Sequence, residues 1–170
     1  MDEKIIYKHN VTLKEKLQSA IDIERISAKC CCHLSSLIKN GKIRSKFFVM
    51  SEVAKVNEAL LCDYLRQLGI THFISEERCK YCKINPESFS LLGAINLGLE
   101  ITEAAITHYK DLVTLVACSE DKKIFKKLLK EKDEQRDFLK KERKFVHEKE
   151  DKNQFDCIMN YCIPKVISKI

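Results

Sequence analysis

The stretch "LLKEKDEQRDFL" (residues 128–139) has the apolar spacing of a buried helix face, yet that face carries two polar residues. Leu128, Lys132, Gln135 and Leu139 recur at i, i+4, i+7 and i+11, and Phe125 extends the same stripe backwards. Side chains at this spacing share one face of an α-helix, and such a face normally packs into the core. The pattern therefore predicts a lysine and a glutamine inside the protein, where each needs a polar partner.

Composition favours a helical domain. The chain has 170 residues, of which 45% are hydrophobic and 33% charged, with four Gly, two Pro and no Trp. The net charge of +6 comes from interleaved charges, and no basic run alternates with stacking aromatic residues, so nucleic acid is not expected as a partner. No apolar run approaches the ~20 residues that cross a bilayer, so no membrane contact is expected. The N-terminal "MDEKIIYKHN" has no apolar leader, which predicts a cytoplasmic chain whose nine cysteines are free thiols.

Four long amphipathic helices are predicted from the apolar period, at residues 13–38, 45–68, 88–118 and 121–147. Gly41 is expected to end the first helix and Gly69 the second. A charged link and a short C-terminal helix near 155–167, bent at Pro164, follow them. The predicted organisation is an N-terminal extension (1–12), a bundle (13–147) and a tail helix (148–170).

The two halves of this bundle align with one constant shift of 78 residues, which places Glu24 on Thr102 and Asn57 on Gln135. Such an internal repeat describes two helix hairpins. The linker between them, residues 70–87, is long for a connection within a bundle. The sequence thus predicts an all-α bundle of two hairpins joined by a long crossover.

Six positions interrupt the four apolar stripes with polar or small residues. One lies on the first helix, one on the third, and a pair spaced by three on each of the second and fourth. This is the layout of a di-iron carboxylate centre, in which two helices give one Glu each and two give a Glu-x-x-His. The positions are Glu24, Ala54, Asn57, Thr102, Lys132 and Gln135.

Over about residues 13–147 the sequence resembles the ferritin-like superfamily, in its rubrerythrin-like branch. "AIDIERISAKCC" and "GLEITEAAITHY" resemble that family's Glu-x-x-Ala-x-x-x-Tyr helices. "FFVMSEVAKVNEALL" and "FKKLLKEKDEQRDFL" resemble its Phe-x-x-x-Ala-x-x-Glu-x-x-His helices. The resemblance implies a ferritin-like four-helix bundle, often a homodimer, and places the six metal ligands of the family at the six positions above. Only Glu24 keeps the family's residue, as the relic of a metal site.

These replacements argue against a metal. Lys132 adds a positive charge and offers no lone pair, and one carboxylate with an amide and a hydroxyl cannot hold two iron ions. We predict instead that Lys132 forms a buried ion pair with Glu24, and that Asn57, Gln135 and Thr102 complete the hydrogen bonds. The alternative interpretation is that Lys132 reaches solvent from the edge of its stripe.

A ligand register shifted by one turn would change this interpretation. It would combine Glu24 with neighbouring carboxylates that otherwise look solvated among lysines, and iron would then be the expected cofactor. These carboxylates are Glu100, Glu103, Glu131 and Glu134.

The predicted crossover contains "CKYC", Cys79 to Cys82, which is half of a structural zinc site. Cys157 and Cys162 in the tail, or His72, could complete four ligands. A redox-active dithiol and plain thiols are the other two interpretations of the pair.

Three functions compete. The preferred one is a ferritin-like bundle whose degenerate di-iron site holds no metal and which acts in binding or scaffolding, not in catalysis. The second is a metal-dependent oxidoreductase that handles iron or peroxide with a non-standard ligand set. The third is a Bcl-2-like helical interaction module, suggested by "SFSLLGAINLG", which would bind an amphipathic helix in a groove.

Overall fold

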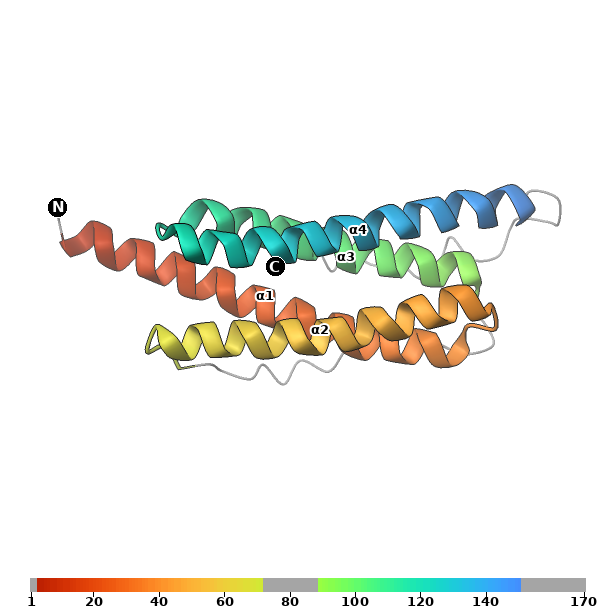
Figure 1. Cartoon of the computed structure of the whole chain (residues 1–170), viewed down its shortest axis with the longest axis horizontal. Helices are drawn as coiled ribbons and strands as arrows, with labels where there is room; N and C mark the ends of the chain where they lie inside the picture. Colours follow the sequence, from red (N-terminus) through yellow and green to blue (C-terminus); the bar gives the residue numbers. More distant parts are fainter. Residues whose placement is uncertain (1–2, 72–88, 151–170) are drawn as a thin grey trace.

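The computed structural model describes residues 3–71 and 89–150, and places side chains for 12–71 and 89–147. These residues form four α-helices: α1 (Glu3–Leu37), α2 (Gly41–Gln67), α3 (Leu91–Leu115) and α4 (Ser119–Glu150). The helices lie side by side as an all-α four-helix bundle (Figure 1). The fold class predicted from the apolar period is confirmed. No described helix combines the length and apolar character needed to cross a bilayer.

The bundle consists of two antiparallel hairpins, α1 with α2 and α3 with α4. α1 packs on α3 between the hairpins, whereas α2 and α4 touch at few points. Figure 1 shows that α2 and α3 run in the same direction, so α2 ends at the opposite end of the bundle from the start of α3. This arrangement requires a connection as long as the predicted crossover.

Helix boundaries differ from the prediction at the start of α1 and at the turn between α1 and α2. α1 begins at Glu3, so residues assigned to an N-terminal extension continue the helix. Gly41 does not close the first helix but opens the second, because the Asn40 side chain accepts a hydrogen bond from the Ile43 amide at 3.1 Å and caps α2. The prediction for Gly69 is confirmed, since its φ of 68° is the left-handed conformation that ends a helix.

The core divides into two apolar clusters along the bundle. One surrounds Tyr109 and Phe125 and the other surrounds Phe47 and Leu139, and all four side chains are fully buried. Polar buried residues lie on the same helices between the two clusters. The long helices are therefore held by burial at two levels, with a polar layer between them.

Gly98 on α3 leaves room for the Phe47 side chain of α2 at the second cluster. A Cβ at this position would lie 2.9 Å from Cε1 of Phe47 and 3.3 Å from Cδ1 of Leu139. Both neighbours are fully buried and have little room to move. A larger residue at position 98 would therefore displace core side chains one turn away from Thr102.

Several predictions concern residues outside the described ranges. The "CKYC" pair and His72 belong to 72–88, and the tail helix with Cys157 and Cys162 belongs to 151–170. The zinc site and the tail helix therefore stay predictions.

Candidate functional site: a buried ion pair in the polar layer

All six positions predicted from the interrupted stripes lie inside the bundle. None of these side chains is more than 4% exposed, although four helices contribute them. Two of them, on different hairpins, are in direct contact: Lys132 and Glu24. The six are Glu24 on α1, Ala54 and Asn57 on α2, Thr102 on α3, and Lys132 and Gln135 on α4.

Lys132 and Glu24 form an ion pair at the centre of the layer. The Lys132 Nζ donates to Oε2 of Glu24 at 2.8 Å, and the two side chains are 1% and 0% exposed. The predicted pair is confirmed, and the alternative in which Lys132 reaches solvent is wrong. Opposite charges neutralise each other here, so neither is buried without a partner.

Tyr109 on α3 binds the other oxygen of the same carboxylate, and sequence reasoning missed it. Its hydroxyl donates a short hydrogen bond to Oε1 of Glu24. Burial, together with the negative charge of Glu24, raises the pKa of Tyr109 well above its ordinary value, so the hydroxyl keeps its proton. The sequence feature that could have identified Tyr109 is its spacing of seven residues from Thr102, which puts both residues on one helix face.

The predicted hydrogen bonds from the remaining polar residues are wrong. Thr102 donates its hydroxyl to the backbone oxygen of Gly98 at 2.7 Å, within its own helix. Asn57 donates to Oε1 of Glu131 across the α2–α4 interface at 3.4 Å. Oε1 of Gln135 is buried and has no hydrogen-bond partner among the described residues. The charged pair is thus satisfied by Tyr109 and not by the amides.

Cys31 lies beside the pair at the position that the internal shift equates with Tyr109. Its Sγ is 4.0 Å from the Ser27 hydroxyl, and the side chain is fully buried. Burial raises the pKa of the Cys31 thiol to about 11. The thiol is therefore protonated and poorly nucleophilic at neutral pH, and it serves as a small core residue.

We expect this buried thiol to shape the alkaline limit of stability. The unfolded chain ionises Cys31 near the ordinary pKa of 9.0, while the folded chain keeps the proton up to about pH 11. The free energy of unfolding should therefore fall as pH rises through this window, by roughly 2–3 kcal/mol from this group. Urea unfolding at pH 8, 9, 10 and 11 measures it.

The control for this prediction is a pair of cysteine variants. Cys31→Ala should show a shallower alkaline decline than the wild type, whereas Cys118→Ala, at an exposed thiol, should keep the wild-type slope. Equal slopes in all three proteins would contradict the assignment.

The residues do not fit the di-iron centre that the family resemblance implies. Both carboxylate oxygens of Glu24 accept hydrogen bonds, one from an ammonium, and the hydroxyl of Thr102 is engaged with its own helix. Ala54 offers no donor atom. Among the side chains that the structure describes, no three from His, Cys, Asp and Glu gather as metal ligands would. The layer as it is built therefore lacks the ligands for a di-iron centre.

The carboxylates of the shifted register do not join Glu24 either. Glu103 is exposed and its Oε1 lies 3.3 Å from the Lys140 ammonium. Glu134 is exposed, whereas Glu131, which was expected to be solvated, is half-buried against Asn57. Burial raises the pKa of Glu100, which lies half-buried on α3.

No family model matches the chain, and no curated protein matches its sequence.

Proposed function

We propose that this chain is a ferritin-like bundle in which an ion pair has replaced the metal centre and which works by binding other proteins. The observation that carries the proposal is the Lys132–Glu24 pair at 2.8 Å, at the positions where the family pattern expects carboxylate ligands. The Lys132 cation supplies, inside the bundle, positive charge of the kind that a metal ion would otherwise bring. The layer then needs no cofactor for its electrostatic balance.

The burial of the layer supports a structural role over catalysis. Glu24, Tyr109 and Lys132 are at most 1% exposed, and their polar atoms bind one another. A substrate would have to enter a packed layer and displace these bonds. Catalytic sites are normally concave and accessible, so the surface is the better candidate for function.

Iron loading tests this proposal. We expect the purified chain, incubated with Fe(II) in air and desalted, to carry no more iron than a non-binding control protein. It should also lack the near-ultraviolet absorbance of an oxo-bridged iron pair. Iron approaching two ions per chain would overturn the proposal in favour of an oxidoreductase with a non-standard ligand set.

A further inference from the structure

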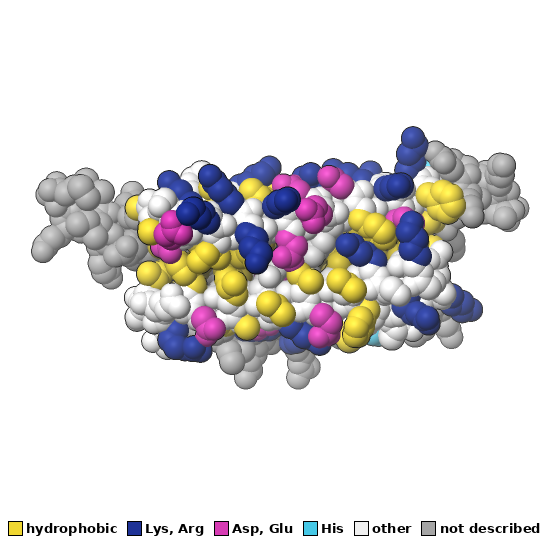
Figure 2. All heavy atoms as spheres, viewed as in Figure 1, with side chains coloured by type: hydrophobic (Ala, Val, Ile, Leu, Met, Phe, Trp, Pro, Cys, Tyr) yellow, Lys and Arg dark blue, Asp and Glu magenta, His cyan; other side chains and the backbone are white. Residues whose placement is uncertain are grey.

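An apolar groove runs between α2 and α4, two helices that touch at few points. Val56 and Leu60 line its α2 side, and Val49 and Val53 continue the same helix stripe at the spacing i, i+4, i+7 and i+11. Val56 is 65% exposed, which is unusual for a side chain on a continuous apolar stripe. Figure 2 shows hydrophobic side chains in a band along this face of the bundle.

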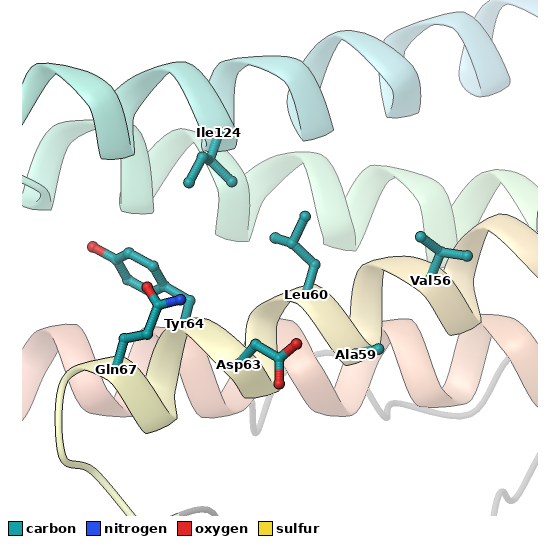
Figure 3. Close-up of a pocket in the computed structure, with 7 residues that line it drawn as sticks. All are labelled: Val56, Ala59, Leu60, Asp63, Tyr64, Gln67 and Ile124. Atoms are coloured by element: carbon teal, nitrogen blue, oxygen red, sulfur yellow. The ribbon is translucent and has the colours of Figure 1, made fainter.

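Toward the C-terminal end of α2 the groove contains an open pocket with a volume of about 420 Å³. Val56 and Leu60 point toward α4, and Ile124 points back from α4 (Figure 3). Asp63 and Gln67 also line it, from the last turns of α2. Its walls are therefore two antiparallel helices with apolar side chains between them, a shape that can accept a third helix.

The two rims of the groove differ in charge. Along α2, exposed charges neutralise each other locally, as in the Lys55–Glu52 and Arg66–Asp63 pairs. Along α4, exposed lysines outnumber acidic residues, and Figure 2 shows Lys and Arg side chains crowding this side. Lys123 and Lys140 are paired with carboxylates, whereas the exposed lysines with no ion pair within the described part of the chain include Lys127, Lys130 and Lys141.

Polar contacts join α2 and α4 along the groove, among them the hydrogen bond at 2.9 Å from the Tyr64 hydroxyl to Oδ2 of Asp121. Half-buried Glu131 accepts from Asn57 at 3.4 Å midway along the two helices. This bond uses only part of the hydrogen-bonding capacity of the carboxylate. A helix that lies over it needs a hydrogen-bond donor at that level, which fixes its register.

We propose that the α2–α4 groove binds an amphipathic helix of a partner protein, with its apolar stripe on the valines and acidic residues facing the α4 lysines. The inference deepens the proposed function, on which it rests for the view that the chain works by binding. A second copy of this chain is the poorer occupant, because a twofold contact would bring equally basic α4 rims close together. An acidic helix gains both apolar burial and charge complementarity.

The test uses the full chain and a designed fluorescein-labelled peptide of about six helical turns. The peptide has a Leu/Ile stripe with one central Gln and glutamates on both flanks, and the control peptide carries lysines in place of the glutamates. By fluorescence anisotropy we expect the acidic peptide to bind at least about tenfold more tightly, a preference that salt reduces. Equal affinities, or no binding of the acidic peptide, would overturn the proposal.

Variants locate the binding site. The double variant Val56→Asp, Leu60→Asp should bind the acidic peptide at least about tenfold more weakly, because it places two charges in the apolar stripe. Phe48→Asp, at an exposed residue of α2 outside that stripe, is the matched control and should bind as the wild type does. Equal losses in both variants, or none, would overturn the assignment of the groove.

Charge reversal and sedimentation complete the design. Lys127→Glu, Lys130→Glu and Lys141→Glu together should reverse the preference between the two peptides. Sedimentation measures whether the chain is a monomer at the concentration used for binding. A dimer that is lost in the Val56→Asp, Leu60→Asp variant would show that a second copy occupies the groove, and would overturn the proposal. Iron uptake by the wild-type chain decides the proposed function separately, since no peptide result depends on it.

Discussion

Replacing Lys132 with Met should destabilise the protein by about 3–5 kcal/mol, the cost of leaving one partner of a buried ion pair uncompensated. Glu24→Gln should cost a similar amount, because it leaves the ammonium buried against a neutral amide. Total stabilities of natural domains are about 5–15 kcal/mol, so either change removes a large part. Urea unfolding followed by circular dichroism measures both.

The matched control is an exposed lysine on the same helix. Lys130→Met removes the same charge from α4 at the surface and should change stability by less than about 0.5 kcal/mol. A loss in Lys132→Met no larger than that of Lys130→Met would contradict the buried pair.

Removing the whole hydrogen-bonded group should cost far less than removing one member. Glu24→Leu, Lys132→Met and Tyr109→Phe together replace the layer with apolar groups of similar size and leave no polar atom from the triad unpaired. This variant should recover most of the stability lost in the single variants. The non-additivity separates loss of a charge pair from mere loss of packing.

Restoring the carboxylate and imidazole ligands should convert the chain into an iron-binding protein. The restored variant combines five substitutions with the native Glu24: Ala54→Glu, Asn57→His, Thr102→Glu, Lys132→Glu and Gln135→His. We expect about two iron ions per chain, against none in the wild type, because two helices then give one Glu each and two give a Glu-x-x-His. Iron analysis after desalting gives the count.

The fold of the restored variant has to be measured with and without metal. Four carboxylates in one buried layer repel one another, so the metal-free variant should have a low Tm. Fe(II) or Co(II) should raise that Tm as ligand binding stabilises the folded state, and should leave the wild-type Tm unchanged. A variant that is folded at low temperature but takes up no metal would contradict the alignment of the six positions.

The apolar period predicted the four helices and the buried layer because both depend on spacing along one helix. Glu24 and Lys132 could be paired from sequence, since two opposite charges assigned to one buried layer have few other partners. Tyr109 was harder, because a tyrosine on an apolar stripe resembles any aromatic core residue until the acceptor of its hydroxyl is known. Gly41 was misassigned because the capping amide of Asn40 competes with the glycine signal.

The remaining errors have a common physical origin in local competition. Thr102 was expected to reach across the bundle, but its hydroxyl finds the Gly98 carbonyl one turn back on the same helix. Asn57 was expected to bond to the ion pair, but its amide donates to Glu131 across the α2–α4 interface. Sequence spacing predicts which residues share a layer, but it does not decide which of several nearby acceptors a short polar side chain chooses.

The most direct measurement is a crystal structure of the wild-type chain grown with excess Fe(II), with data collected at the iron absorption edge. The account predicts that Lys132 Nζ lies near 2.8 Å from Oε2 of Glu24, that the Tyr109 hydroxyl binds Oε1, and that the layer shows no anomalous iron peak. An iron peak bound to Glu24, with the Lys132 ammonium displaced from the carboxylate, would contradict it.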